Sequence, residues 1–337
     1  MKNVLIIGAG LSGIYLATLL QKQCNVTVLE ARDRIGGRIL TVDGFDMGPS
    51  WVWSHQHNIL KLIAENALGI FQQYTKGLAV YDTPGGVENF TPPPSAPSAR
   101  IKGGVITLVN ALAEKLHSGT VRLNAVVTAV EQRDQKLLVK TEEKIFEADI
   151  VINTLPPRLA IEKIAYLPAL SPDLLTQLAA IPTWMGYSAK CTVEFEEPFW
   201  RHKGLSGFAF SHIGPLGELH DSCTESRAAL FGFFHSRSQD KSPEAVRAQM
   251  VRLFGKDAEK IKNIYITDWS REAFTSVRAD RTALAAHPNY GFDADAFGGR
   301  LIFTGTESAF QDGGYLEGAV LSADKTANKL RLGFTAQ

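Results

Sequence analysis

The sequence predicts an α/β fold in which a Rossmann-type nucleotide-binding domain is interrupted by a second, α+β domain. Three observations lead to this prediction. The chain opens on a strand, a glycine-rich turn and a helix, and it closes on another strand, turn and helix. Between them lie a proline-rich loop and a long stretch of mixed strands and helices. A chain of 337 residues is long enough to form two cores.

The opening turn has the spacing of a phosphate-binding loop. Residues 4–7 are apolar and β-prone, and Gly8, Gly10 and Gly13 follow in the pattern G-x-G-x-x-G before an apolar helical stretch. Gly8 permits the sharp turn, and Gly13 lets the helix pack closely on the strand. The missing Cβ at Gly10 lets a pyrophosphate approach the backbone at the positive end of the helix.

The second strand supplies the next part of this site. It reads "NVTVLE" and ends at Glu30, near the place expected for an acid that binds ribose hydroxyls. Arg38 follows a pair of glycines, where an arginine suits a second pyrophosphate contact. These residues predict a dinucleotide with a free 2′-hydroxyl, but they do not decide between NAD and FAD.

The elements that follow alternate between the two domains. Residues 61–70 look helical, and the proline-rich loop at 91–99 predicts a crossing between domains. Apolar residues at helical spacing predict a helix over 106–116. Three short strands joined by polar turns span 121–148, and the apolar run at 150–153 predicts a return into the parallel sheet.

The rest of the chain completes the second domain and then the first. Residues 161–295 mix strands with a helix capped by Ser242, after which a strand, a glycine–threonine turn and a helix beginning near Gly314 close the chain. We expect the nucleotide-binding domain to contain residues 1–70, 98–158 and 298–335, and the substrate domain residues 71–97 and 159–297.

The composition excludes several classes of function. Lysine plus arginine equals aspartate plus glutamate at 35 each, which argues against a nucleic-acid partner. Cys24, Cys191 and Cys223 form neither a disulfide framework nor a metal motif, which is typical of thiols in a reducing cytosol. No apolar run reaches the ~18 residues of a membrane span, and the first is too short for a signal peptide. We therefore expect a cytoplasmic protein with no metal and no membrane partner.

Several of these motifs, in this order, resemble the flavin-containing monoamine and polyamine oxidases. The blocks that carry the resemblance are "GAGLSG", "LEARDRIGGR", "IKGGVITLVNALAEKL", "INTLPP", "KCTVEFEEPFW", "TDW" and "IFTGTESAFQDGGYLEGAVLSA". The resemblance extends from Val4 to about Leu330, and it implies FAD rather than NAD. The residues that it implies for FAD binding are Gly8, Gly10, Ser12, Gly13, Glu30, Ala31, Arg32, Gly37, Arg38, Val127, Gly305, Thr306, Glu307, Gly314, Leu316 and Ala319.

The resemblance also implies three catalytic residues. Lys190 looks like the family lysine that holds a water at flavin N5, and Trp269 looks like the tryptophan that lies along the flavin. Tyr315 is similar to one wall of the aromatic cage around the substrate. Each has a structural alternative, because a lysine can lie on a solvated strand edge and aromatic residues often anchor a core.

This chain also departs from the family pattern. Arg278 stands where some monoamine oxidases carry the cysteine that bonds the flavin, so we expect non-covalent FAD. Ala279 and Asp312 replace two aromatic residues of the pocket, which leaves the aromatic cage incomplete. The chain is also short between residues 60 and 100, which predicts a more open cavity.

The resemblance implies an FAD-dependent amine oxidase. An amine would transfer hydride to flavin N5, O₂ would take the electrons and give H₂O₂, and the imine would hydrolyse to an aldehyde. Similar L-amino-acid oxidases carry an arginine after a glycine–proline turn, whereas Trp51 stands near that place here, so we expect an amine without an α-carboxylate. Arg278 could still bind an anionic substrate, and Asp312 could attract a second amino group. Trp51, Arg278 and Asp312 are therefore the candidate substrate-pocket residues.

Three alternatives remain open at this point. The chain could be an L-amino-acid oxidase, a related desaturase or dehydrogenase with a non-amine substrate, or a flavoprotein that uses FAD only to hold its fold. The sequence identifies neither the amine, the physiological electron acceptor nor the oligomeric state.

Overall fold

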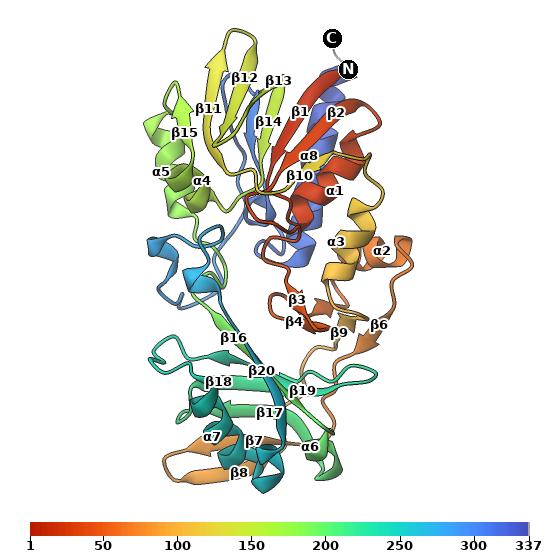
Figure 1. Ribbon diagram of the computed structural model, residues 1–337, viewed down its shortest axis with the longest axis vertical. Coiled ribbons are helices and arrows are strands. Elements are labelled where there is room, and N and C mark those ends of the chain that lie inside the picture. The colour runs from red at the N-terminus through yellow and green to blue at the C-terminus, as the bar shows by residue number, and fades with distance from the viewer. Residues whose placement is uncertain (336–337) are drawn as a thin grey trace.

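In the computed structural model of the protein, residues 1–335 are described, with side chains through residue 331. Figure 1 shows an elongated molecule with an upper lobe, which holds the first strand and the last helix, and a lower lobe dominated by one sheet. Within residues 1–335, no helix has the combination of length and apolar character that a membrane crossing requires.

The upper lobe is built on a six-stranded sheet in the order β10-β2-β1-β14-β22-β21. Strand β1 pairs in parallel with β2 and β14, and β14 pairs in parallel with β22, while β21 closes one edge antiparallel. The strands are β1 (Lys2–Ile7), β2 (Cys24–Leu29), β10 (Val121–Arg122), β14 (Ile150–Asn153), β21 (Ala294–Ala296) and β22 (Leu301–Phe303). This parallel arrangement confirms the predicted Rossmann-type fold.

Helices cover one face of this sheet, and a smaller sheet with two helices covers the other (Figure 1). The first face carries α1 (Leu11–Leu20), α2 (His57–Glu65), α3 (Ile106–Ala113) and α8 (Leu316–Thr335). The second carries β11 (Val127–Arg133), β12 (Lys136–Thr141), β13 (Ile145–Ala148) and β15 (Ala165–Leu167), with α4 (Pro157–Lys163) and α5 (Pro172–Ala180). Each layer buries its own apolar cluster against the sheet.

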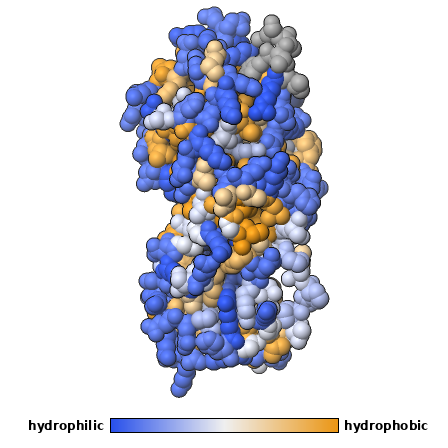
Figure 2. Space-filling view, turned by 90° about the vertical axis from the view of Figure 1, so that its right-hand side faces the viewer, coloured by the Kyte–Doolittle hydropathy of each residue, from blue (hydrophilic) through white to orange (hydrophobic). Residues whose placement is uncertain are grey.

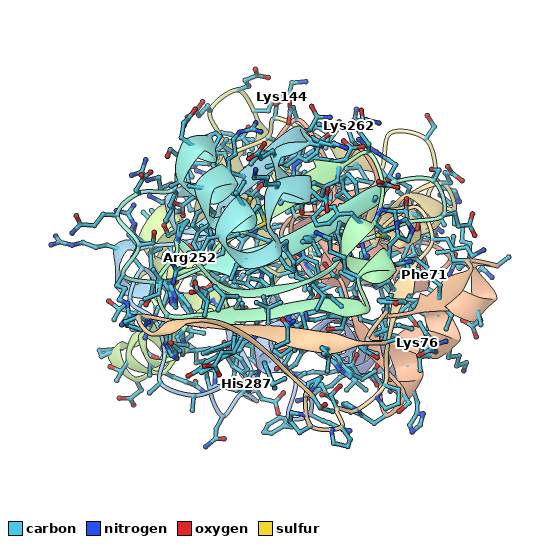
Figure 3. The ribbon with its side chains drawn as sticks, turned by 90° about the horizontal axis from the view of Figure 1, so that it is seen from below. Phe71, Lys76, Lys144, Arg252, Lys262 and His287 are labelled. Atoms are coloured by element: carbon cyan, nitrogen blue, oxygen red, sulfur yellow. The ribbon has the colours of Figure 1, made fainter. Side chains whose placement is uncertain are left out.

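The lower lobe is a seven-stranded sheet in the order β20-β16-β19-β18-β17-β7-β8. Its strands are β7 (Leu78–Thr83), β8 (Gly86–Phe90), β16 (Ala189–Phe195), β17 (Leu205–Ser211), β18 (Leu216–Asp221), β19 (Ala228–Phe234) and β20 (Ile261–Asp268). Helices α6 (Phe199–His202) and α7 (Pro243–Phe254) pack on it around a separate core. Figure 3, seen from below, shows α7 on the outer side of the sheet, so the other face is turned toward the upper lobe.

A short hairpin, a small three-stranded sheet and four 3₁₀ turns complete the described part of the fold. The hairpin consists of β3 (Thr41–Val42) and β4 (Phe45–Asp46), and the three-stranded sheet consists of β5 (Val52–Trp53), β9 (Ser98–Ile101) and β6 (Ile70–Gln72). The 3₁₀ turns are Lys256–Glu259, Trp269–Arg271, Arg278–Asp280 and Thr306–Ser308. The proline-rich loop connects β8 of the lower sheet to β9, as the predicted crossing between domains requires.

Most of the predicted local elements are present. The helix at 106–116 forms as α3, and Ser242 Oγ accepts a hydrogen bond from Ala245 N at 3.2 Å to cap α7. Of the strands expected over 121–148, residues 127–148 form an antiparallel meander, whereas residues 121–122 join the parallel sheet as β10. The helix expected over 61–70 instead ends at Glu65, because Ala67 has a left-handed φ of +53° that stops it. Residues 70–72 then form β6.

The sheet pairing also changes where we place the domain boundary. Strand β15 pairs in parallel with β11, and β21 pairs with β22, although the sequence assigned both segments to the substrate domain. Leu178 of α5 lies in the same apolar cluster as the β11–β13 meander. We therefore propose that residues 159–180 and 294–297 belong to the nucleotide-binding domain.

Candidate functional site

A cavity of about 740 Å³ lies between the two lobes, and residues of both line it. The glycine-rich loop and Glu30 line one end, and the inner face of the lower sheet lines the other. Figure 2 shows apolar side chains gathered at the waist of the molecule, where the lobes meet. A single cavity therefore joins the predicted phosphate-binding loop to a mainly apolar chamber.

The loop end of the cavity has an open approach to the backbone. Helix α1 begins directly after Gly10, and a Cβ added at Gly10 would meet only Gly36 O, at 3.9 Å. Gly8 has a φ of +103°, in the region that favours glycine. Ser12 Oγ donates to Ala319 O at 3.2 Å, which ties α1 to α8 beside the cavity. Gly8 N donates to Leu29 O at 2.8 Å and Ala9 N donates to Glu30, so the part of this turn that is open to a ligand in the cavity begins at Gly10.

Glu30 is held in place by main-chain donors. Its side chain is buried, with Oε2 accepting from Ala9 N at 2.9 Å and Oε1 accepting from Arg32 N at 3.0 Å. Because the carboxylate remains on the cavity wall, its free lone pairs suit the hydroxyls of a ribose.

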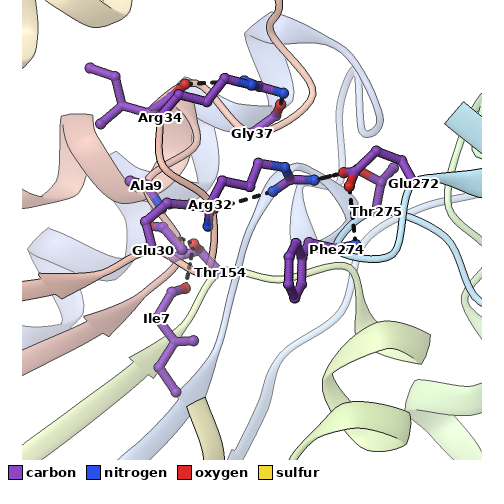
Figure 4. A network of polar contacts seen from close by, with 12 residues as sticks. Ile7, Ala9, Glu30, Arg32, Arg34, Gly37, Thr154, Glu272, Phe274 and Thr275 are labelled. Atoms are coloured by element: carbon purple, nitrogen blue, oxygen red, sulfur yellow. Dashed lines mark hydrogen bonds and ion pairs between the residues drawn. The ribbon is translucent and has the colours of Figure 1, made fainter. Parts of the chain in front are cut away.

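Arg32 connects this site to the segment that follows β20 (Figure 4). Its guanidinium pairs with Glu30 and Glu272 and donates to Thr275 Oγ1 at 2.8 Å. The ring of Phe274 lies 5.6 Å from the guanidinium carbon. Arg32 thereby ties the segment that follows β20 to the end of β2.

Two buried polar groups beside the cavity lack hydrogen-bond partners among the described residues. Arg38 Nη2 lies 2.7 Å from Glu307 Oε1, yet neither oxygen of the fully buried Glu307 accepts a hydrogen bond, and Arg32 Nε also has none. Such groups indicate a ligand that supplies the missing partners. With the open approach at Gly10 and the free capacity of Glu30, the unpartnered donor of Arg32, which lines the cavity, fits the phosphates and ribose of the FAD that the sequence implies.

Lys190 on β16 is buried at the apolar end, with 2% of its surface exposed. Its Nζ donates to Gly48 O at 2.9 Å and to Ser50 Oγ at 2.6 Å, and it lies 4.2 Å from the ring centre of Phe231. Burial lowers the pKa of Lys190 to about 7, while the nearby Asp46 carboxylate opposes that shift. The alternative of a lysine on a solvated strand edge is therefore wrong.

Three predicted aromatic residues line the same chamber. Trp269 is buried, with Nε1 donating to Met47 O at 2.9 Å. Trp51 Nε1 donates to Gln73 Oε1 at 2.8 Å, and its ring meets Phe231 at a centroid distance of 5.2 Å. Tyr315 packs edge-on against Trp53 at 5.7 Å. Each indole has a fixed hydrogen bond, so the walls of the chamber are held in one orientation.

The structure brings most of the predicted residues to the cavity, but not all of them. The predicted residues that line it are Gly8, Gly10, Ser12, Glu30, Arg32, Gly37, Arg38, Thr306, Gly314, Leu316, Ala319, Lys190, Trp269, Tyr315 and Trp51. Those that do not line it are Gly13, Ala31, Val127, Gly305, Glu307, Arg278 and Asp312. Gly13 instead packs against the backbone of Gly8. Glu307 is buried outside the cavity lining and contacts Arg38, which does line the cavity.

The sequence placed Arg278 and Asp312 in the substrate pocket, and the structure corrects both assignments, because neither residue lines the cavity. Arg278 is exposed on a 3₁₀ turn whose next residues include the buried Asp280. Asp280 accepts hydrogen bonds from Arg158 at 2.8 Å and from Thr183 N at 3.0 Å, and these bonds fix the turn with Arg278 outside. Asp312 Oδ1 lies 3.6 Å from His55 Nε2, and Asp312 does not line the cavity.

Several lining residues were missed from the sequence. They are Trp53, Trp184, Tyr187, Phe210, Glu218, Phe231, Phe233 and His235. The alternation in "ALFGFF" could have placed Phe231 and Phe233 on one face of a strand. The others depend on sheet register and loop packing, for which no local motif exists.

Comparison with known proteins places the fold and the family. Residues 85–331 match the family model described as flavin containing amine oxidoreductase, and residues 6–65 match that of the NAD(P)-binding Rossmann-like domain. The flavin-containing amine oxidase A of Canis lupus familiaris is 24% identical, over 98% of this chain and 85% of that protein. The flavin-containing amine oxidase B of Sus scrofa is 25% identical, over 97% of this chain and 86% of that protein.

Two solved structures share the architecture. A putrescine oxidase bound to putrescine superposes with a TM-score of 0.84 at 23% identity, covering 98% of this chain and 99% of that chain. The cyclohexylamine oxidase from Brevibacterium oxydans IH-35A gives a TM-score of 0.81 at 20% identity, with the same coverage. At these identities the likeness establishes the fold.

Proposed function

Because this chain belongs to the flavin-containing amine oxidoreductases, with FAD as cofactor, we propose that it oxidises a small amine to an imine and uses O₂ as electron acceptor. The observation that carries this proposal is the single cavity that joins the glycine-rich loop to an aromatic chamber containing the buried Lys190. We further propose that the backbone from Gly10 into the first turn of α1, with Arg38, holds the pyrophosphate and that Glu30 holds the ribose.

FAD, when bound, accepts the two electrons removed from the amine carbon and passes them on. The chain's own part is to present the amine without its charge. A free amine has a pKa near that of lysine, about 10, so it arrives protonated and without a usable lone pair. The walls formed by Trp51, Phe231 and Tyr315 disfavour the charged form by desolvation. Lys190 supports this, because the same chamber brings its own pKa down to about 7.

Lys190 has a hydrogen-bonding capacity that its protein contacts do not exhaust. Gly48 O and Ser50 Oγ each accept one hydrogen bond from Nζ, which leaves the ammonium form one further donor and the neutral amine form one lone pair. Since Lys190 also lines the cavity, we propose that its remaining hydrogen bond holds a water molecule facing the reacting amine. The resulting imine then hydrolyses to an aldehyde in water.

The alternative of an L-amino-acid oxidase depended mainly on Arg278 as a cation in the substrate pocket. Such an enzyme needs a cation for the substrate carboxylate, and Arg278 does not line the cavity. The experiment is a comparison of kcat/KM for matched pairs such as phenethylamine and L-phenylalanine. We expect the amine to be preferred about tenfold or more, which corresponds to about 1.4 kcal/mol. Preference for the amino acid would overturn the proposal.

Anaerobic mixing with a panel of amines separates the remaining alternatives. Bleaching of the flavin by amines, followed by H₂O₂ release when O₂ is admitted, supports the amine oxidase. Bleaching only by non-amine reductants supports a desaturase or dehydrogenase, and no bleaching by any of them supports a flavoprotein without catalytic activity. Either of the last two results contradicts the proposal.

We expect the FAD of this enzyme to be bound without a covalent link. By the resemblance, Arg278 takes the place of the cysteine that links the flavin in some monoamine oxidases. The three cysteines are buried and do not line the cavity. Acid or heat precipitation should therefore release all the flavin into the supernatant. Flavin that stays in the washed pellet and co-migrates with the chain in a denaturing gel would refute this prediction.

A further inference from the structure

His287 lies on an irregular segment, residues 281–293, whose two ends are fixed. Just before it, Asp280 accepts hydrogen bonds at 2.8 and 3.0 Å, and near its end Phe292 N donates at 3.3 Å to a carbonyl of the 3₁₀ turn before α8. Ala283 of this segment lines the cavity. The proline that follows His287 disfavours a helical backbone there. The segment therefore presents His287 from a backbone that is held on both sides.

The imidazole of His287 stacks on the ring of Tyr315. Their centroids lie 5.0 Å apart and their planes differ by 6°. Tyr315 lines the cavity and His287 does not, so the imidazole backs the wall instead of forming it. Residues 278–286 contain no aromatic side chain, so His287 is the first ring that this part of the chain brings to Tyr315. The other ring in contact with Tyr315 is Trp53, which meets it edge-on at 5.7 Å.

Tyr315 has no hydrogen bond that would hold the orientation of its ring. Its backbone is fixed, because Tyr315 N donates to Asp312 O at 3.2 Å and Tyr315 O accepts from Thr306 Oγ1 at 2.7 Å. Its phenolic hydroxyl, however, has no hydrogen-bond partner among residues 1–331. Trp51 and Trp269 differ in this respect, since each indole N–H donates to an oxygen. The orientation of this one wall of the chamber therefore depends on the rings packed against it.

The imidazole of His287 is itself held on three sides. Its Nε2 lies 3.0 Å from Gly313 O, and because a carbonyl only accepts, Nε2 donates this hydrogen bond. The rings of Trp184 at 4.7 Å and Tyr290 at 5.4 Å meet the imidazole at steep angles. Tyr290 is fixed in turn, since its hydroxyl donates to Pro182 O at 2.7 Å. The imidazole is thus a rigid backing for the ring that it covers.

We propose that His287 is a positioning residue for the reaction, and that its ring fixes the orientation of Tyr315 at the cavity wall. This inference rests on the proposed amine oxidation. Without the imidazole, one face of Tyr315 would lose its packing partner, and the ring would be free to rotate about its Cα–Cβ bond. The amine would then be held less closely, and a misplacement of about 1 Å can slow a reaction about 100-fold.

Three substitutions separate the ring of His287 from its hydrogen bond. His287→Ala removes both, His287→Phe keeps a ring without the donor, and His287→Gln keeps a donor without the ring. For phenethylamine we expect kcat/KM to fall about tenfold or more in His287→Ala and in His287→Gln. His287→Phe should stay within about threefold of the wild type. Because His287 is exposed, flavin content and the urea midpoint should not change.

His202→Ala is the control. His202 is an exposed histidine on α6 whose Nδ1 lies 3.7 Å from Glu197 Oε2, and it does not line the cavity. We expect wild-type kinetics from this variant. If His287→Ala also has wild-type kinetics, or if the glutamine restores the rate and the phenylalanine does not, the stacked ring has no positioning role and the inference is wrong.

A direct view of Tyr315 keeps the two proposals distinguishable. In crystal structures of the holoenzyme, we expect one orientation of the Tyr315 ring in the wild type and in His287→Phe, and a rotated or divided orientation in His287→Ala. An unchanged Tyr315 in His287→Ala would overturn the inference, while amine oxidation by the wild type would still support the proposed function. If no amine is oxidised, the proposed function fails, and the orientation of Tyr315 alone decides whether His287 positions it.

Discussion

Lys190→Met is expected to slow the oxidation of amines by roughly 100-fold or more while FAD remains bound. Methionine keeps much of the bulk of the side chain but removes the charge and the donors. The water that we place on Nζ would lose its partner, and so would Gly48 O and Ser50 Oγ. Stopped-flow measurement of flavin reduction by the amine and of reoxidation by O₂ shows which half of the reaction is affected.

The pH dependence of stability gives this variant a second readout. The pKa of Lys190 is lowered from 10.5 to about 7, so between these pH values the folded state binds fewer protons than the unfolded state. The contribution of Lys190 to the free energy of unfolding therefore rises with pH across this window. Below pH 7, where Lys190 is protonated in both states, burial of its charge destabilises the folded state most. Methionine does not titrate. Wild type measured relative to Lys190→Met, both as apoprotein in urea, should thus gain stability between pH 7 and pH 9.

The control for both measurements is Lys144→Met. Lys144 is exposed on the turn between β12 and β13, and Figure 3 shows it projecting from the surface. We expect wild-type rates and an unchanged pH profile of stability. If Lys190→Met also keeps wild-type rates in both half-reactions, Lys190 has no part in the chemistry.

Gly13→Ala is expected to destabilise the protein by about 3 kcal/mol or more and to abolish FAD binding. A Cβ at Gly13 would lie 2.0 Å from Gly8 O, which is backbone of the same turn. To remove this clash, α1 would have to move away from β1, and that movement would also displace the loop that faces the cavity. Urea unfolding of the apoprotein and flavin content after purification measure the two effects.

Gly10→Ala is the matched substitution, because it adds the same methyl group to the same loop. Its Cβ would meet only Gly36 O at 3.9 Å, and the backbone φ of −72° suits alanine. We expect the apoprotein to keep its stability, whereas FAD affinity should fall about tenfold or more because the methyl group projects into the cavity. Equal effects of the two substitutions on apoprotein stability would contradict this assignment of roles.

The sequence could predict the features that depend on short-range patterns. The spacing of Gly8, Gly10 and Gly13 gave the nucleotide-binding turn, and Ser242 gave the start of α7. Both follow from backbone requirements that only a few residue types meet. The resemblance added Lys190 and Trp269, which the structure brings to one cavity, although their catalytic roles remain proposals.

The features that could not be predicted depend on contacts between distant parts of the chain. Nothing local marks the parallel pairing of β15 with β11. Arg278 was placed beside the substrate by its position in the motif, whereas the hydrogen bonds of Asp280 turn that segment outward. Glu218 had no motif, and only the register of β18 against β19 places it in line with Lys190.

The cavity between the lobes has a consequence for the cooperativity of the whole molecule. The two lobes have separate apolar cores, but the cavity walls come from both, and Arg32 bridges them through Glu272. A ligand that requires the complete cavity binds only when both lobes are folded, and its binding free energy adds to the stability of that state by mass action. FAD therefore couples two units that their own cores would leave independent, and unfolding of either lobe carries the cost of releasing it.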